Sequence, residues 1–285
     1  LKIKCNCRKP NVGMILKATA ELNIDLSSSW FIGDSTSDVL AAKNSGIKSI
    51  LVETGYAGLD GKYNISPDFV SRDLFNAAKF ITSDFGLIYN YIKGIFSNYQ
   101  RQKIIRIGGL SKSGKTTFSN VLKFFLKDKG LTVHLISIDR WIKNLKDRSK
   151  TVIGRYDIAE IKSFIDLISA NKNKEIQTKL PYYNKIENKC ILDFEEIKIN
   201  KSDIIIIEGT IVFEIESKIK SFDIYLNRNE EERKKDVTRE YNLRGLDNEN
   251  ALKIYEKRNI DEVPFIEKKT YINETYEIIN LKKII

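Results

Sequence analysis

Short apolar runs alternate with helical repeats along most of this 285-residue chain. Apolar, β-branched runs predict buried strands at residues 30–32, 49–52, 104–107, 132–138 and 203–209. Helical patterns follow or separate these runs at about residues 12–22, 37–45, 117–126 and 229–244. Strands that alternate with helices are typical of a parallel sheet, so we predict an α/β fold.

A stretch without strand patterns divides the chain. Residues 83–100 carry apolar side chains at positions 85, 88, 91, 92, 95 and 96. This spacing predicts an amphipathic connecting helix rather than a flexible linker, because linkers contain few aromatic residues. The length of the chain suits about two domains. We therefore expect one domain over residues 1–82, the connecting helix over 83–100 and a second domain over 101–285.

The clearest motif follows the predicted strand at 104–107. Residues 109–116 fit the pattern G-x-x-x-x-G-K-[ST] at every fixed position, and a helical pattern follows at once. Glycines let backbone N–H groups turn toward phosphates, and the helix adds the positive end of its dipole. Strand, loop and helix in this order favour a nucleoside triphosphate site over a surface turn without a ligand.

We expect this loop to bind ATP and Mg²⁺. Lys115 would reach the β- and γ-phosphates, and the Thr116 hydroxyl would bind the metal ion. The residues expected around the nucleotide are Gly109, Leu110, Ser111, Lys112, Ser113, Gly114, Lys115, Thr116 and Thr117.

Two further predicted strands end in acidic residues. Asp139 follows the strand at 132–138, and Glu208 follows four consecutive isoleucines. Ligands of open α/β sheets bind beyond the carboxyl ends of the strands, so both acids are expected near the phosphates. We expect Asp139 to accept the proton of a substrate hydroxyl and Glu208 to support Mg²⁺. A helix cap is the alternative role for Asp139.

The charged helix predicted at 229–244 carries Arg233, Arg239 and Arg244. Guanidinium groups pair bidentately with phosphate oxygens, so these side chains could close over ATP. The alternative is a solvated helix face with ion pairs one turn apart, which the sequence leaves open.

The motifs RIGGLSKSGKTT, ISIDRW, LPYYN, IIIIEG and VTREYNLRG occur in the order found in the uridine kinase and phosphoribulokinase-like family. This resemblance covers nearly all of residues 101–285. It implies a five-stranded parallel sheet with a lid and ATP-dependent phosphorylation of a hydroxyl group. By the same resemblance, Asp139 is the catalytic base, Tyr183 lies in the substrate pocket, and Arg239 and Arg244 belong to the lid.

The substrate segment departs from that family. Asn184, Asn188 and Cys190 stand where uridine kinases carry an acid, a histidine and an arginine, and the segment after Asp157 is shorter. We therefore expect an acceptor other than uridine.

The first 82 residues carry a second set of charged side chains. Asp34 and Asp38 follow the predicted strand at 30–32, where paired carboxylates suit Mg²⁺ and also serve as helix caps. Residues 1–57 resemble the C-terminal part of the haloacid-dehalogenase-like phosphatases that act on heptose bisphosphate and histidinol phosphate. The resemblance implies a phosphoryl contact at Lys9, a substrate-phosphate contact at Arg8, magnesium ligands at Asp34 and Asp38, and zinc ligands at Cys5 and Cys7.

This segment lacks two features of those phosphatases. Their nucleophile lies in an earlier D-x-D motif, and two of their four zinc ligands also come earlier in the domain. The chain begins at Leu1 within this motif-rich segment, so we expect a fragment whose zinc site needs upstream ligands. We expect no phosphatase activity from this chain alone, and a partner or a missing N-terminal half would complete residues 1–82.

Composition changes this picture little. The net charge of +10 comes from 48 basic and 38 acidic residues without a long block of one sign. Such a surface suits ATP and phosphorylated metabolites, and nucleic acid is not an expected partner. No signal peptide, membrane span or disulfide framework is recognisable, so we expect a cytoplasmic protein without a membrane partner. The single histidine, His134, lies in an apolar strand, which argues against Ser-His-Asp and Cys-His mechanisms.

These observations predict an ATP-dependent kinase that phosphorylates a small metabolite, preceded by a phosphatase-like segment. By association with that segment, we expect a sugar-like or polyol acceptor. Two alternatives stay open: a phosphatase completed by missing N-terminal residues, and a regulatory module that binds ATP without catalysis.

Overall fold

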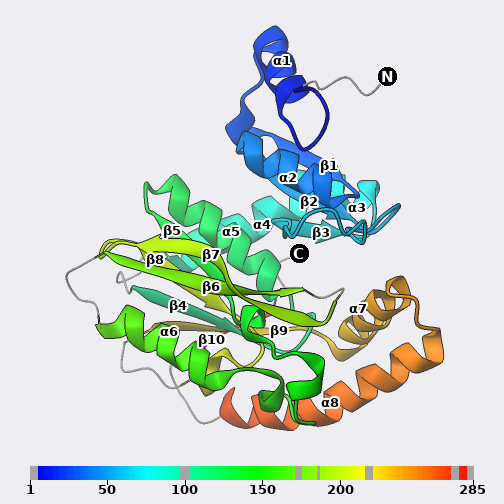
Figure 1. The fold of residues 1–285 in the computed structure, drawn as a ribbon, viewed down its shortest axis with the longest axis vertical. Helices are drawn as coiled ribbons and strands as arrows, with labels where there is room; N and C mark the ends of the chain where they lie inside the picture. The colour runs from blue at the N-terminus through cyan, green and yellow to red at the C-terminus, as the bar shows by residue number, and fades with distance from the viewer. Residues whose placement is uncertain are drawn as a thin grey trace. The chain divides into compact units, whose positions relative to one another are not determined.

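The chain folds into two compact units, Leu1–Gly86 and Leu87–Ile285, in the computed structural model. The structure describes residues 6–96, 103–170, 175–184, 187–215, 221–270 and 276–280. Each unit is described by itself below, and Figure 1 shows the order of their elements. Among these described residues, no helix has the length and apolar character needed to cross a membrane.

The first unit contains a small parallel sheet with the order β1-β2-β3. Its strands are β1 (Trp30–Gly33), β2 (Lys48–Val52) and β3 (Phe69–Ser71). Its helices are α1 (Gly13–Leu22), α2 (Thr36–Ser45) and α3 (Leu74–Lys79), and the π-helical turn Phe80–Asp84 follows. Trp30 packs edge-on against Phe80 and Phe85, so aromatic side chains form much of the contact between the sheet and the following helices.

The second unit is built on a five-stranded sheet with the order β10-β9-β4-β8-β5, and every pair in it is parallel. The strands are β4 (Ile104–Gly108), β5 (Val133–Ser137), β8 (Ile204–Glu208), β9 (Ser221–Asn227) and β10 (Tyr276–Asn280). The predicted α/β fold and the five-stranded parallel sheet are therefore confirmed.

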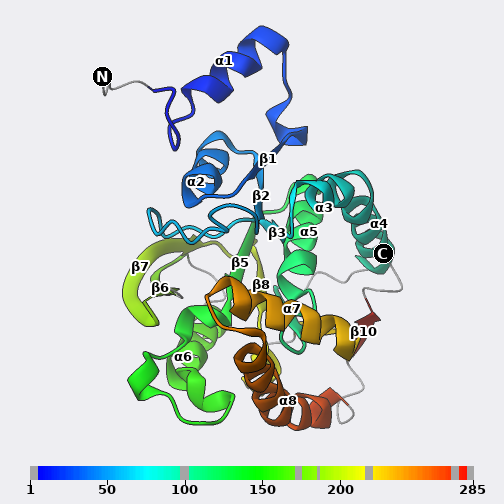
Figure 2. The same cartoon turned by 90° about the vertical axis from the view of Figure 1, so that its right-hand side faces the viewer.

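Helices and a hairpin surround this sheet (Figures 1 and 2). Helix α5 (Lys115–Asp128) packs on β4, β5 and β8, and helices α7 (Glu230–Leu243) and α8 (Asn248–Thr270) contact each other. The remaining elements are α4 (Phe85–Ile95), α6 (Ile158–Ala170) and the antiparallel hairpin of β6 (Ile176–Asn184) and β7 (Lys189–Ile199). The part of the predicted connecting helix at 97–100 lies outside the described residues.

Burial on both faces explains the isoleucine run of β8. Side chains alternate between the two faces of a strand, so both faces must be covered when every residue is apolar. Ile205 and Ile207 belong to one core cluster with residues of α6 and the hairpin, and the other isoleucines of β8 are equally buried. The run therefore predicted a central strand correctly.

His134 and Asp203 lie at the start of β5 and just before β8. The His134 ring nitrogen Nε2 lies 2.9 Å from Oδ2 of Asp203, and the backbone N–H of Asn200 donates to the same oxygen at 2.8 Å. These hydrogen bonds outweigh burial and lower the pKa of Asp203. The contact ties neighbouring strands together, as expected for a structural histidine.

Candidate active site

The phosphate-loop segment joins the end of β4 to the start of α5. Gly109 has φ +145° and Gly114 has φ +94°, while Lys112 also adopts a left-handed backbone at φ +60°. A Cβ atom at Gly109 would lie 2.4 Å from the carbonyl oxygen of Leu226, so glycine is required there for steric reasons as well. The loop therefore has the tight backbone that the sequence pattern predicts.

We expect Gly109→Ala to weaken nucleotide binding by at least about tenfold and to destabilise the second unit by about 2 kcal/mol or more, because the Cβ atom forces a strained loop away from Leu226. Nucleotide titration and denaturant unfolding measure the two effects. Gly130→Ala is the matched control, since Gly130 also has a positive φ of 76° but no atom within 4 Å of the added Cβ. Equal effects of both substitutions would contradict the prediction.

Lys115 folds back over the loop. Its Nζ donates to the carbonyl oxygens of Gly109 at 3.0 Å and Leu110 at 2.8 Å. Burial lowers the pKa of Lys115, although the nearby carboxylates of Glu208, Asp139 and Glu262 act in the opposite direction. An ammonium group has three donors, so this arrangement leaves one donor for a ligand after the two loop contacts.

The other polar side chains of the loop differ in exposure. Thr116 is exposed in the first turn of α5, and Thr117 is half-buried. Ser113 is fully buried, and its hydroxyl has no hydrogen-bond partner among the described residues. Buried polar groups normally have a partner, which marks the inside of the loop as a place for a polar ligand.

Glu208 and Asp139 lie at the same edge of the sheet as the loop. Glu208 ends β8, is 6% exposed and stands in register with Ile107 of β4 and Ser137 of β5. Asp139 follows β5 in the 3-10 turn Ile138–Trp141. The N-cap of that turn is Ser137, whose hydroxyl accepts the Asp139 N–H at 3.3 Å, so Asp139 does not have the capping role considered as its alternative.

Tyr156 holds one oxygen of Asp139. Its hydroxyl donates to Oδ1 of Asp139 at 3.0 Å. Burial and the Asp139 carboxylate raise the pKa of Tyr156 well above its ordinary value, so the hydroxyl stays protonated and remains a donor. Nothing in the sequence marked Tyr156 for this role except its proximity to the shortened segment.

The arginines of α7 occupy two different environments. Arg239 pairs with Asp236 at 3.1 Å, and Arg244, the C-cap residue of α7, pairs with Glu240. Arg233 is buried instead, and its Nε donates to the backbone oxygen of Ser111 at 3.0 Å. The structure thus brings Arg233 to the phosphate loop, whereas the lid roles of Arg239 and Arg244 stay predictions.

Two further contacts join the loop to this region of the chain. Arg228, just before α7, donates to the backbone oxygen of Lys112 at 3.0 Å, and the Lys112 ammonium pairs with Glu240 at 3.0 Å. The phosphate loop is thus held by side chains that follow β9, more than 100 residues later in the chain.

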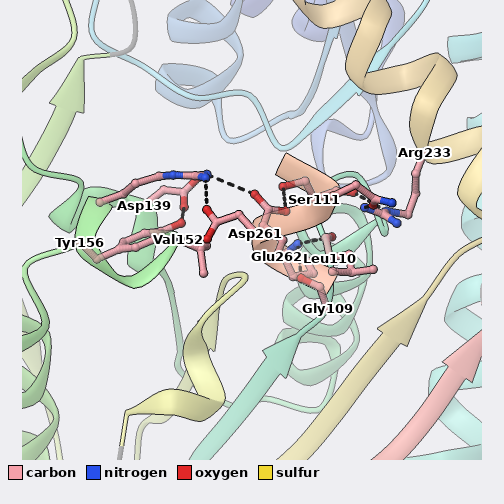
Figure 3. Close-up of polar contacts among 12 residues, drawn as sticks. Gly109, Leu110, Ser111, Asp139, Val152, Tyr156, Arg233, Asp261 and Glu262 are labelled. Carbon is pink, nitrogen blue, oxygen red and sulfur yellow. Dashed lines mark hydrogen bonds and ion pairs between the residues drawn. The ribbon is translucent and has the colours of Figure 1, made fainter. Parts of the chain in front are cut away.

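A carboxylate that the sequence analysis missed also contacts the loop. Glu262 in α8 accepts the Ser111 hydroxyl at 2.7 Å and pairs with Arg155 at 3.2 Å, and Figure 3 shows this group beside the loop. It is separated from Ser111 by 151 positions, so no local pattern could have revealed the contact.

Tyr183 lies in β6, opposite Cys190 of β7. Its hydroxyl donates to Oδ1 of Asn188 at 3.0 Å and accepts a hydrogen bond from Arg148, whose guanidinium lies 5.0 Å from the ring centroid. Directly opposed residues share one face of a hairpin, and the Cys190 thiol contacts the backbone oxygen of Arg140 at 3.6 Å. The hairpin therefore lies beside the segment that carries Asp139.

In the first unit, Asp38 has the helix-capping role considered for it and also pairs with Lys9, while its magnesium role stays a prediction. Ser35 and Asp38 form a capping box at the start of α2, and the Lys9 ammonium pairs with the Asp38 carboxylate. Burial opposes its ionisation, but the hydrogen bonds from Lys9 and Ser35 prevail and lower the pKa of Asp38. Asp34 accepts the Tyr56 N–H at 3.0 Å.

We expect Asp38→Asn to destabilise the first unit by about 1–2 kcal/mol at pH 7, because it removes the ion pair and weakens the capping box. A carboxyl group whose pKa is lowered by folding stabilises above its unfolded pKa and loses this contribution as the pH falls below about 4. The difference should therefore shrink in acid. Denaturant unfolding at pH 7 and pH 3 measures it, and the exposed Glu21→Gln on α1 is the control.

The remaining predicted residues of this unit are less informative. Arg8 and Cys7 are exposed in the turn before α1, and Cys5 lies outside the described residues. The described ranges contain no group of three or more His, Cys, Asp and Glu side chains arranged to hold a metal ion. The zinc and magnesium roles in this unit stay predictions.

The residues around the phosphate loop fit Mg²⁺ in the form that phosphate sites use. That ion commonly takes one or two protein oxygens and completes its shell with phosphates and water. The Thr116 hydroxyl and the Glu208 carboxylate supply such donors at the carboxyl edge of the sheet. A phosphate-bound magnesium ion therefore needs no third acidic side chain.

The first unit is similar to known hydrolases. Residues 6–77 match the family model described as HAD-hydrolase-like. The D-glycero-D-manno-heptose-1,7-bisphosphate 7-phosphatase of Thermosynechococcus vestitus is 40% identical over 78 residues, which are 26% of this chain and 40% of that protein. The D-glycero-beta-D-manno-heptose-1,7-bisphosphate 7-phosphatase of Pasteurella multocida is 52% identical over 52 residues, 18% of this chain and 28% of that protein. The chain thus spans less than half the length of these curated relatives.

Solved structures resemble the larger part of the chain. A candidate fructose transport system kinase from Silicibacter sp. TM1040 has a TM-score of 0.50 at 13% identity, over 67% of this chain and 98% of that one. The protein YGR205w has a TM-score of 0.54 at 14% identity, over 68% of this chain and 95% of that one. Matches of this length fall mostly in the second unit, because the first holds only residues 1–86. The chain therefore joins a segment similar to HAD-like hydrolases to a unit with the fold of these two solved structures.

Proposed function

We propose that the second unit transfers the γ-phosphoryl group of ATP to a hydroxyl group of a small metabolite. The observation that carries this proposal is the meeting of Lys115, Asp139 and Glu208 at one edge of the parallel sheet, around a loop that fits phosphates. These are the groups that phosphoryl transfer needs: a cation for the phosphates, an acceptor for the hydroxyl proton and an oxygen ligand for the metal ion.

The reaction assigns one task to each side chain. The acceptor oxygen attacks the γ-phosphorus, its proton passes to the Asp139 carboxylate, and the bond from the γ-phosphorus to the bridging oxygen breaks to release ADP. Tyr156 occupies Oδ1 of Asp139, which leaves Oδ2 for the hydroxyl. Lys115 stabilises the negative charge on the phosphate oxygens. Thr116 and Glu208 would hold Mg²⁺, which would supply positive charge to the phosphates.

We further propose a sugar-like or polyol acceptor. Two findings support it: the first unit is similar to phosphatases of a heptose bisphosphate, and a protein with the same fold is a candidate fructose transport system kinase. The support is associational, since a fold carries many functions, and it therefore defines the acceptor panel rather than one compound.

The first unit supports a second candidate, hydrolysis of a sugar bisphosphate. The favouring observation is the similarity of residues 6–77 to HAD-like hydrolases, together with Asp34, Asp38 and Lys9 near the carboxyl end of β1. No D-x-D pair occurs in the 285 residues, so we expect no release of phosphate from heptose bisphosphate. Hydrolysis above a buffer blank that Asp34→Ala abolishes would establish this second activity.

The test of the kinase proposal is transfer from ATP and Mg²⁺ to a panel of sugars, sugar phosphates, polyols and nucleosides. We expect a phosphorylated acceptor whose formation needs the metal ion and the acceptor together. Labelled ATP that binds but gives no product with any acceptor would instead favour the regulatory module that binds nucleotide without catalysis. Substitution of GTP for ATP in the same assay determines the nucleotide preference.

A further inference from the structure

Glu262 is a buried carboxylate that the proposed reaction does not use. It is 2% exposed and lies in α8, far from the phosphate loop in sequence. Burying a carboxylate is costly unless both of its oxygens find donors. Here Oε2 accepts the Ser111 hydroxyl at 2.7 Å, and Oε1 accepts Arg155 Nη1 at 3.2 Å. One side chain thus connects the phosphate loop to the segment around Arg155.

The neighbouring acid holds the same segment. Asp261 Oδ2 pairs with Arg155 Nη2 at 2.5 Å, and its Oδ1 accepts the Val152 N–H at 3.0 Å. Arg155 therefore donates to two consecutive carboxylates, an arrangement that fixes the plane of the guanidinium group. Helix α8 thus contacts residues 152–155 through the Arg155 side chain and through the Val152 backbone N–H.

The segment at residues 152–155 is followed directly by the residue that contacts the proposed base. Tyr156 follows Arg155 in the chain, is buried, and donates to Asp139 Oδ1 at 3.0 Å. Figure 3 shows Tyr156 and Asp139 on one side of the Asp261–Glu262 pair, and Ser111 on the other. A continuous series of contacts therefore runs from the phosphate loop through Glu262 to Asp139.

The charge of Glu262 affects ionisable groups at both ends of this series of contacts. The Glu262 charge contributes to the pKa values of both Lys115 and Tyr156, which lie at the two ends of this series. Its carboxylate favours the charged form of Lys115 and opposes ionisation of Tyr156. Glu262 therefore acts on the phosphate-binding cation and on the residue that orients the base.

We propose that Glu262 is a positioning residue that sets the placement of Asp139 relative to the phosphate loop, so that nucleotide in the loop orders residues 149–157. The proposal rests on the proposed function, since it takes Asp139 as the base. It adds a link between the nucleotide side and the acceptor side of the same site. The physical requirement is that Ser111 and Arg155 share one carboxylate, so that ordering of one segment favours ordering of the other.

Hydrogen exchange tests this link without an identified acceptor. The probe is a non-hydrolysable ATP analogue with Mg²⁺ at saturating concentration. In the unaltered protein we expect backbone exchange in residues 149–157 to slow by about tenfold, within the range usual for coupled sites. In Glu262→Gln, which keeps the shape but loses the charge, the slowing should fall below about twofold. Glu256→Gln, an exposed position of α8, should behave like the unaltered protein.

Ser111→Ala tests whether the effect of Glu262→Gln on exchange comes only from disruption of the buried ion pair with Arg155. It leaves the buried pair of Glu262 and Arg155 intact and removes only the hydroxyl on the loop. We expect it also to lose the slowing of exchange at full occupancy by the analogue. Once an acceptor is known, Glu262→Gln should lower kcat by about tenfold or more with the KM for ATP changed less than about threefold.

The outcomes separate the two proposals. Binding of the analogue with unchanged exchange in residues 149–157 of the unaltered protein overturns the link and leaves the kinase proposal standing. Slowing of exchange in Glu262→Gln and Ser111→Ala that equals the slowing in the unaltered protein also overturns the link and leaves the kinase proposal standing. Absence of analogue binding to the unaltered protein overturns the kinase proposal and this inference with it.

Discussion

Asp139→Asn is expected to lower kcat for phosphoryl transfer by about 10²–10⁴-fold, the usual contribution of a general base. Asparagine keeps the size of the side chain and can still accept the Tyr156 hydroxyl through its amide oxygen. It cannot take up the proton of the acceptor hydroxyl. The fold and the nucleotide site should therefore persist, and ATP affinity should change by less than about threefold.

Single-turnover transfer and nucleotide titration on the same sample separate these two effects. The matched control is Asp147→Asn, which changes an exposed acid in the segment after Asp139. Retention of more than about one tenth of the activity in Asp139→Asn would assign the proton to another group. An equal loss of ATP affinity and of kcat would indicate that Asp139 organises the nucleotide site rather than the chemistry.

The local parts of this site were predictable because each one is encoded within a few residues. The pattern at 109–116 combines glycines, a lysine and a threonine, and its backbone requirements leave few alternatives, as the clash of a Cβ at Gly109 with Leu226 shows. The isoleucines before Glu208 predicted a strand buried on both faces, and the register of β8 with β4 and β5 confirms that placement. The parallel register then brings the strand ends together without further sequence information.

The support around the site was not predictable from these patterns. Glu262, Asp261 and Arg155 belong to none of the recognised motifs, and their pairing depends on how α8 packs against the segment after β5. Contacts over more than 100 positions carry no periodic signal. Only the tertiary fold shows that these charges are paired and buried.

The sequence also carries a signal that separates the three arginines named in the charged helix. Arg233 and Val237 are the buried positions of α7, and they stand four residues apart on one helical face. Val237 is the apolar residue in the middle of an otherwise charged helix, so it marks the inward face and places Arg233 on it. Arg239 and Arg244 pair with acidic residues of α7 instead. Position on the helix, rather than residue type, decides which arginine reaches the loop.

Strand β9 was missed for a different reason. Residues 222–226 form an apolar and aromatic run interrupted by Asp223, and that acid pairs with Arg106 of the neighbouring strand β4 at 2.5 Å. A charged residue inside a strand pattern suggests a surface position, but here the partner strand supplies the opposite charge. The pairing Arg106–Asp223 places β9 beside β4 in the sheet.

Lys115→Ala is expected to reduce phosphoryl transfer by at least about 10³-fold and to weaken ATP binding by about tenfold or more. The ammonium group is held inside the loop by the backbone oxygens of Gly109 and Leu110. Preorganised donors of this kind contribute about 10²–10³-fold each, and a full positive charge beside the γ-phosphate adds to that contribution. Truncation also leaves two loop carbonyl oxygens without their donor, which loosens the loop around the phosphates.

The assay is the same acceptor panel, measured together with nucleotide titration and thermal unfolding. Lys127→Ala is the matched control, because Lys127 is an exposed lysine in the last turn of the same helix. A large loss for Lys115→Ala, no loss for Lys127→Ala and similar unfolding temperatures for both variants would assign the effect to the phosphate site. If Lys115→Ala kept transfer within tenfold of the unaltered protein, the loop at 109–116 would not be the site of the reaction. The chemistry would then have to be sought in the first unit, where Lys9 pairs with Asp38 near the carboxyl end of β1.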